Sequence, residues 1–266
     1  LRDRLARGEF GALKELRFCG IWPRPVSYFQ RNEWAGQLWS GDYPVMDSVT
    51  GNAMGHYVQN LFHWAGVLED RAVARLGSVE SKLWRANSIE SFDSILSSAV
   101  TEAGVEIRVA ATHANADQNQ NLEIVVCEDA KIYFDVYSGY KVIKGGRVTE
   151  AGNFYDHGTL PRNYLAYLDC LKEGREPCNT LEAAESFVLF NGLSLVSSGE
   201  IGVLDSLLRG DSSTGSGVHH SAEFATMLKS FLSEGQLPDC GPASRRVVPS
   251  DIGQLDASLK TLCSNP

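Results

Sequence analysis

The sequence predicts an α+β fold, with one large, mostly antiparallel β-sheet and helices packed on one face. Two observations predict it. In the middle third of the chain, short segments alternate apolar and polar side chains with a period of two, as strands with one covered face do. Before and after this region, apolar residues recur at helical spacing instead. A helix, a run of strands and then further helices is the element order of α+β proteins.

The N-terminal part of the chain is expected to hold a helix end, a strand and a helix. Residues 1–8 resemble the end of a helix, and a strand over residues 12–22 should stop at Pro23 and Pro25, because proline cannot donate to a β-ladder. A helix is expected over residues 53–65, capped by Asn52. Its buried stripe is expected to comprise Met54, Tyr57, Val58, Leu61 and Ala65.

The rest of the chain divides into strands followed by helices. Expected strands cover residues 93–101, 105–112, 122–126, 132–136 and 142–143. Expected helices cover residues 160–171, about 180–197 and a segment after Ser221. The resulting boundaries are a helix end at 1–8, an α+β domain at 9–210, a flexible loop at 211–218, and a C-terminal helix and tail at 219–266 that pack on the same domain.

Composition excludes several classes of function. The 266 residues are 43% hydrophobic and 21% charged, which is ordinary for a soluble globular domain. A net charge of -9 argues against binding to nucleic-acid phosphates. No segment reaches the roughly 18 apolar residues of a membrane span. Six scattered cysteines without a CxxC motif indicate reduced thiols, so a cytoplasmic location is expected.

The window from Gly41 to Gly66 carries the most informative chemistry. Asp47 precedes the expected helix, and His56 and Asn60 share one of its faces at a spacing of four residues. A carboxylate beside a histidine makes a proton-transfer pair, because imidazole titrates near neutral pH and a carboxylate orients and tunes it. The structural alternative is a helix cap and a histidine in ordinary packing. A metal-dependent hydrolase using Asp47, His56 and His63 is a further alternative, with His63 about two turns along.

A second polar and aromatic cluster follows the proline stop, in the segment VSYFQRNEWAG. It contains Tyr28, Arg31, Asn32 and Trp34. Aromatic faces suit the C–H faces of sugars, and Arg and Asn side chains suit hydroxyl or carboxylate groups. Anchoring of the loop onto the core by Tyr28 and Trp34 is the alternative interpretation.

These residues resemble the second domain of the glucose-fructose oxidoreductase / inositol dehydrogenase / MocA (Gfo/Idh/MocA) family. In that domain a Gly-rich approach, an Asp, a His and a helix-ending Gly follow one another, as Gly41, Asp47, His56 and Gly66 do here. Residues 8–18 resemble the entry into the same domain. The chain departs from the pattern in two ways: eight residues separate Asp47 from His56 where the family has three, and Gln59 stands where a second Asp is frequent.

The resemblance implies a substrate-binding and oligomerisation domain of a nicotinamide-dependent oxidoreductase that acts on a sugar, polyol or related hydroxyl compound. It implies that His56 accepts the hydroxyl proton and that Asp47 holds the other imidazole nitrogen. Substrate contacts are expected from Tyr28, Arg31, Asn32, Trp34, Asn52 and Asn60, and a homo-oligomer is expected through the open face of the sheet. A non-catalytic ligand-binding or assembly domain of the same fold remains the alternative.

The cofactor, NAD or NADP, is expected to be bound mainly by a domain that this chain lacks. The family's N-terminal Rossmann domain carries a Gly-x-Gly-x-x-Gly turn, whereas the nearest approach here, Gly215-Ser216-Gly217, has His220 in place of the third glycine. The chain also begins without Met in what looks like mid-helix, so a fragment is expected. Alone, it should bind no nicotinamide nucleotide and show no turnover.

Overall fold

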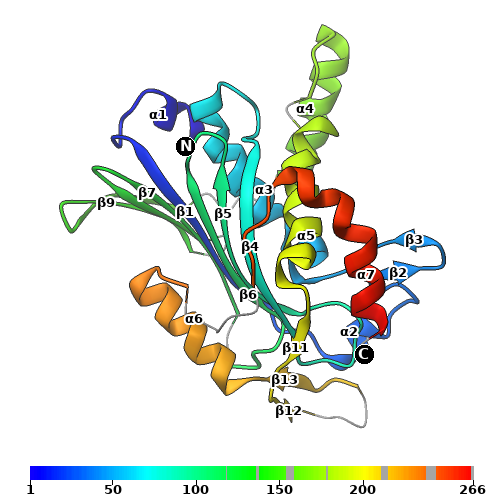
Figure 1. The fold of residues 1–266 in the computed structure, drawn as a ribbon. Helices are drawn as coiled ribbons and strands as arrows, with labels where there is room; N and C mark the ends of the chain where they lie inside the picture. The colour runs from blue at the N-terminus through cyan, green and yellow to red at the C-terminus, as the bar shows by residue number, and fades with distance from the viewer. Residues whose placement is uncertain are drawn as a thin grey trace.

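A nine-stranded sheet forms the centre of the molecule, with the strand order β10-β9-β8-β7-β1-β6-β5-β4-β11 (Figure 1). The computed structural model describes residues 1–117, 119–135, 138–153, 159–177, 179–210, 215–237 and 244–264. The β1–β6 and β4–β11 pairs are parallel and the other pairs in this sheet are antiparallel. The predicted α+β class with a mostly antiparallel sheet is confirmed.

The strands of the large sheet are β1 (Leu13–Ile21), β4 (Leu76–Arg85), β5 (Ser94–Thr101), β6 (Glu106–Thr112), β7 (Gln120–Cys127), β8 (Lys131–Asp135), β9 (Gly139–Lys144), β10 (Arg147–Gly152) and β11 (Ile201–Val203). Two hairpins are formed by β2 (Trp39–Ser40) with β3 (Tyr43–Pro44), and by β12 (Leu207–Arg209) with β13 (Val218–His220). The helices are α1 (Arg2–Ala6), α2 (Val26–Phe29), α3 (Gly55–Ala65), α4 (Thr159–Glu173), α5 (Glu185–Ser198), α6 (Ala222–Glu234) and α7 (Leu255–Ser264).

The main core lies between the sheet and helices α3 and α5. Phe18 of β1 stacks on Tyr57 of α3 with 4.6 Å between ring centroids, and Phe62 of α3 meets the ring of Phe190 of α5. All four rings are buried. At roughly 25 cal/mol per Å² of apolar surface removed from water, this layer fixes α3 against β1. The predicted stripe of α3 is confirmed as core.

Helix α6 packs on the opposite face of the sheet, so the prediction that helices cover one face only is wrong. A second apolar cluster contains Cys19 and Ile21 of β1 together with Phe224, Leu228 and Phe231 of α6. The physical reason is that β1 is apolar on both faces: Phe18 faces α3, and its neighbour Cys19 faces α6. Figure 1 shows α6 crossing the face of the sheet away from α3 and α5.

Helix α4 projects from the body of the molecule (Figure 1). Apolar residues recur at helical spacing along this helix, but four of their side chains are 47–65% exposed. The exposed members are Tyr164, Tyr167, Leu168 and Leu171. These four side chains therefore do not contribute to the core.

The start of α3 differs from the prediction. Ser48, not Asn52, caps the first turn, because its hydroxyl accepts a hydrogen bond from the backbone N–H of Gly51 at 2.9 Å. A π-helical turn over Val49–Ala53 follows, and α3 proper begins only at Gly55. The expectation of a single helix capped by Asn52 is wrong, because the Asn52 side chain donates a hydrogen bond to Asp47 instead.

Two further expectations concern the segments between elements. Of the loop expected at 211–218, residues 211–214 lie outside the described residues, and Val218 already belongs to β13. The last residue of the strand expected at 132–136 also lies outside them. Among the described helices, none combines the length and apolar character needed to cross a bilayer.

Candidate functional site

The segment that follows β1 presents an arginine held between aromatic rings. The Arg31 guanidinium carbon lies 3.8 Å from the ring centroid of Tyr28 and 5.0 Å from that of Trp34. One guanidinium nitrogen donates a hydrogen bond of 2.6 Å to the Tyr28 carbonyl. Stacking of a guanidinium on an aromatic face is favourable and removes freedom from both side chains. Three of the predicted substrate-binding residues therefore form one cluster.

Asp47 connects this cluster to the turn before α3. Its side chain is only 7% exposed, and its two carboxylate oxygens accept hydrogen bonds of 2.7 Å from the Asn52 side chain and the Gly36 backbone N–H. The Arg31 guanidinium lies 3.7 Å away and forms an ion pair with it. A buried carboxylate needs such partners to remain charged. Asp47 thus unites two groups that are far apart in the sequence.

The backbone next to Asp47 is unusual. Met46 has φ of 46°, in the left-handed region that residues with a side chain seldom adopt. Positions held in sparsely populated conformations cluster at functional sites, because the surrounding structure must over-determine them. This outlier supports Asp47 as part of a built site.

His56 lies in the first turn of α3 with its side chain exposed. Its ring contacts that of Tyr57, with 4.1 Å between centroids. Partial burial lowers the pKa of His56 below its usual range. The imidazole is therefore neutral at pH 7 and able to accept a proton.

The structure does not bring His56 and Asp47 into direct contact. Within the described part of the chain, His56 makes no hydrogen bond with Asp47, and both oxygens of that carboxylate are already occupied by Gly36 and Asn52. The lengthened connection between the two residues accounts for this, because Asn52 lies between them and binds the carboxylate first.

Asn60, one turn after His56, reveals a residue that the sequence analysis missed. Its side-chain amide donates a hydrogen bond of 3.1 Å to Glu123 of β7. Burial raises the pKa of Glu123 to about 8, although the bond from Asn60 opposes the shift. Its carboxyl group is therefore mostly protonated at pH 7, which is a state suited to acid–base work.

Glu123 is the polar residue of an alternating strand, and this pattern predicts an exposed side chain, not a buried one. The alternation of Leu122, Ile124 and Val126 indicates that these residues share one face of the strand and that Glu123 lies on the other. In the structure Glu123 pairs with Phe18 across the β1–β7 ladder and so shares the face that α3 covers, while Ile124 lies on the α6 side. Both faces of β7 are covered at this point, and alternation alone cannot say which one α3 occupies.

The remaining predicted residues have local roles. The side chain of Asn32 accepts a hydrogen bond of 3.2 Å from the Trp34 backbone N–H, which shapes the loop. The ring nitrogen Nδ1 of His63 lies 2.8 Å from the carbonyl of Ala72. No group of three or more His, Cys, Asp or Glu side chains positioned to hold a metal occurs among the described residues.

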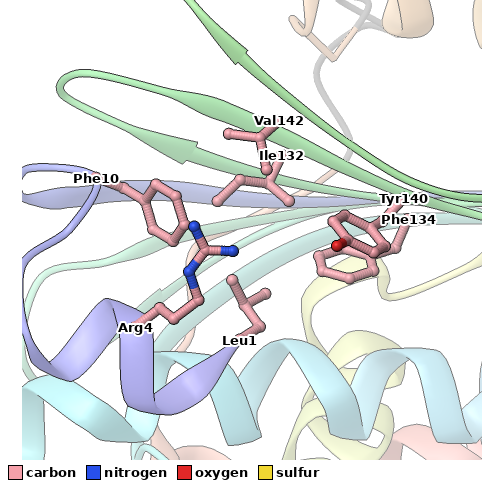
Figure 2. Close-up of a pocket in the computed structure, with 7 residues that line it drawn as sticks. All are labelled: Leu1, Arg4, Phe10, Ile132, Phe134, Tyr140 and Val142. Carbon is pink, nitrogen blue, oxygen red and sulfur yellow. The ribbon is translucent and has the colours of Figure 1, made fainter. Parts of the chain in front are cut away.

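A cavity of about 270 Å³ lies elsewhere, between α1 and strands β8 and β9 (Figure 2). Its walls are mainly apolar, and its one cationic group, Arg4, lies over the ring of Phe10 and pairs with Glu9 and Glu150. None of the predicted site residues lines it. The lining residues are Leu1, Arg4, Phe10, Ile132, Phe134, Tyr140 and Val142.

Comparison with known proteins gives similarity of fold. No family model matches the chain, and no curated protein matches its sequence. Among solved structures it is similar to the WlbA dehydrogenase of Bordetella pertussis, solved in complex with NADH and UDP-GlcNAcA: TM-score 0.52, 20% identity, 71% of this chain and 54% of that one. It is also similar to UDP-N-acetylglucosamine 3-dehydrogenase GnnA of Acidithiobacillus ferrooxidans, with a TM-score of 0.55 and 15% identity; the match covers 73% of this chain and 56% of that one. A third similar structure is levoglucosan dehydrogenase in complex with NADH, with a TM-score of 0.58 and 11% identity; the match covers 82% of this chain and 61% of that one.

The chain shares the fold of part of these sugar dehydrogenases. It spans 54–61% of the length of these three proteins. Sequence identities of 11–20% carry the fold and not the activity, because one fold supports many unrelated functions. The activity of this chain therefore depends on the side chains of its site.

Proposed function

We propose that this chain is the substrate-binding domain of a nicotinamide-dependent oxidoreductase acting on a sugar, polyol or related CH–OH compound. The observation that carries the proposal is that His56 is exposed and neutral in the first turn of α3, one turn after Asn52. Asp47 links Asn52 to the Arg31 cluster, which comprises Arg31, Tyr28 and Trp34. The fold of sugar dehydrogenases supports the proposal. In this function His56 accepts the proton that leaves the substrate hydroxyl as the carbon is oxidised.

The other residues bind and orient the substrate. Trp34 offers an aromatic face to the C–H faces of the substrate, and Arg31 and Asn52 donate hydrogen bonds to its oxygens. Tyr28 positions Arg31, because its ring centroid lies 3.8 Å from the guanidinium carbon. Asp47 is a positioning residue, because its carboxylate holds both of these donors in place. Asn60 and Asn32 complete the substrate contacts, with Asn60 held toward the sheet by Glu123.

The glycine-rich turn Gly215-Ser216-Gly217 lacks the features of a phosphate-binding turn. Gly215-Ser216-Gly217 leads into the short strand β13, not into a helix N-terminus, and a side chain at Gly217 would collide with Leu208. A phosphate-binding turn requires backbone N–H groups at the start of a helix. We therefore assign NAD or NADP to residues outside this turn, in a nucleotide-binding domain joined to this chain.

The assembly and location are also proposals. Helix α6 covers part of the sheet face that the family resemblance assigns to oligomerisation. A homo-oligomer would then use the remaining part of that face, over β7 to β9, where Leu122, Tyr133 and Ile143 are half-buried. The free thiols of Cys19 and Cys127 are consistent with a reducing cytoplasm.

The test is turnover of the complete enzyme with sugars and polyols, followed through the absorbance of reduced nicotinamide. His56→Gln is expected to lower kcat by about 100- to 10,000-fold with a small change in KM, because only the proton-transfer step loses its base. His219→Gln, a histidine on β13, is the matched control and should retain activity. If His56→Gln keeps kcat within about threefold, the assignment of the base is wrong.

A non-catalytic ligand-binding domain is the second candidate function. The observation that favours it is the lack of a hydrogen bond between His56 and Asp47 within the described residues. Such a protein would bind sugars with the same affinity in the wild type and in His56→Gln. It would also turn over none of them with either nicotinamide nucleotide.

A further inference from the structure

We propose that Arg24 forms an anion-binding subsite beside the Arg31 cluster, which receives a carboxylate or phosphate group carried by the substrate. This inference deepens the proposed function, and the identity of the ligand as a substrate rests on it. The chemistry that the subsite recognises is a planar or tetrahedral oxyanion on a hydroxylated compound.

The first support is the placement of the Arg24 guanidinium against two aromatic rings. Its central carbon lies 4.2 Å from the ring centroid of Trp22 and 4.5 Å from that of Tyr28. Rings that stack on a guanidinium cover its faces and leave its N–H donors along the edge. An edge of two parallel donors matches the two oxygens of a carboxylate or phosphate.

The second support is that, among the described residues, the Arg24 guanidinium has ring contacts but no anionic partner. The Nε atom of Arg24 is buried and makes no hydrogen bond. Within the described part of the chain, no carboxylate forms an ion pair with Arg24. Two other carboxylates have partners other than Arg24: Asp47 pairs with Arg31, and Asp117 pairs with Arg209 and lies 3.6 Å from His220. A buried donor without a partner costs free energy that a bound anion would recover.

The third support is continuity with the proposed substrate site. The ring of Tyr28 contacts the guanidinium groups of both Arg24 and Arg31, at 4.5 and 3.8 Å. Two cations therefore contact a single aromatic ring, and one of them, Arg31, pairs with Asp47. Burial chiefly, together with the positive charges of Arg24 and Arg31, lowers the pKa of the adjacent His113 to about 4. The histidine adds no charge at neutral pH, and the cluster carries an excess positive charge.

The fourth support is rigidity. Arg24 stands between Pro23 and Pro25, whose rings fix their backbone φ. Its backbone N–H donates to the carbonyl of His113 at 3.3 Å, and Pro25 pairs with Val218 of β13. A preorganised donor loses little conformational entropy when it binds a ligand.

The test is isothermal titration calorimetry of this chain with four probes: D-glucuronate, D-glucose 6-phosphate, D-glucose and inorganic phosphate. A charged sugar is expected to bind at least about tenfold more tightly than D-glucose, a difference of about 1.4 kcal/mol. The glucuronate and glucose 6-phosphate arms tell a carboxylate from a phosphate.

Three variants test whether the tighter binding of a charged sugar depends on Arg24. Arg24→Gln should abolish the preference for the charged sugar and leave D-glucose binding unchanged. Arg24→Lys should keep part of it, because it retains the charge without the planar fork. Arg147→Gln, on the exposed edge strand β10, should change nothing. A thermal melt of each variant checks that the fold is retained.

The proposal is overturned if charged and neutral sugars bind equally, if no charged probe binds, or if Arg24→Gln keeps the preference. Inorganic phosphate binding as tightly as D-glucose 6-phosphate would overturn the assignment to the substrate. None of these results bears on His56, whose role depends on turnover. Loss of activity in His56→Gln with no preference for anions would leave the proposed function standing without this subsite.

Discussion

Arg31 and Asp47 form an ion pair of 3.7 Å between a loop that follows β1 and the turn that precedes α3. The pair joins the two segments in which the sequence placed its candidate residues. Asp47 is buried and accepts two further hydrogen bonds, so the pair belongs to a network and is not an isolated surface contact.

Replacing Asp47 with Asn is expected to lower the free energy of unfolding by about 1–3 kcal/mol. The two oxygens of Asp47 accept from the Gly36 N–H and the Asn52 amide. An asparagine there would turn its own NH₂ group toward one of these donors and leave that donor unpaired. Urea unfolding measures the effect. The control is Asp42→Asn in the exposed β2–β3 turn, and equal stabilities of the two variants would contradict the prediction.

Glu123 should make the protein less stable as the pH rises. Its pKa in the folded state is about 8, above the ordinary glutamate value of 4.5, because it is buried. Between these pH values the unfolded chain loses the proton and the folded chain keeps it. The free energy of unfolding therefore falls by about 1.4 kcal/mol per pH unit from this group between pH 4.5 and 8.

Glu123→Gln is expected to remove this slope. A glutamine keeps the acceptor for the Asn60 amide, so the hydrogen bond at 3.1 Å can persist. Urea unfolding at a series of pH values should then show the wild type losing stability relative to the variant from pH 5 to pH 8. Glu128→Gln, at an exposed turn, is the control. Parallel pH profiles for wild type and Glu123→Gln would show that Glu123 titrates normally.

His113 should make the protein less stable as the pH falls below neutral, the opposite of the effect of Glu123. Burial lowers its pKa to about 4, and its ring nitrogen Nδ1 lies 2.7 Å from the Trp22 carbonyl. Between pH 6.5 and 4 the unfolded chain binds a proton that the folded chain does not, so stability is lost as the pH falls, by about 1.4 kcal/mol per unit. His113→Gln should flatten this part of the profile. A profile unchanged by the substitution would refute it.

Gly20→Ala should destabilise the contact between β1 and the start of α3. A Cβ at this position would collide with the Met54 sulfur and lie 2.5 Å from an atom of the Phe18 ring. Overpacking of this kind costs about 1–3 kcal/mol. Gly253→Ala, where no neighbour lies within 4 Å, is the control. Thermal unfolding compares the two, and a Gly20→Ala variant as stable as its control would contradict the prediction.

Local patterns predicted the elements well where periodicity was clear. The strand at 12–22 and the hairpin of β5 and β6 were found because proline stops and strict alternation mark them. The start of α3 was missed because Ser48 and Asn52 are both good capping residues, and only the position of Asp47 decides between them. The pairing of Arg31 with Asp47 could not be predicted, because no local rule sets contacts between residues so far apart.

The sequence by itself determined the α+β class, the apolar stripe of α3 and the residue types that gather at its start, because these depend on local periodicity and chemistry. Only the tertiary structure decided that α6 occupies the second face of the sheet, that Asp47 binds Asn52 and Arg31 instead of His56, and that Glu123 is buried beneath Asn60. The physical reason is that burial and pairing depend on which surfaces meet. A strand that is apolar on both faces leaves that choice to long-range packing.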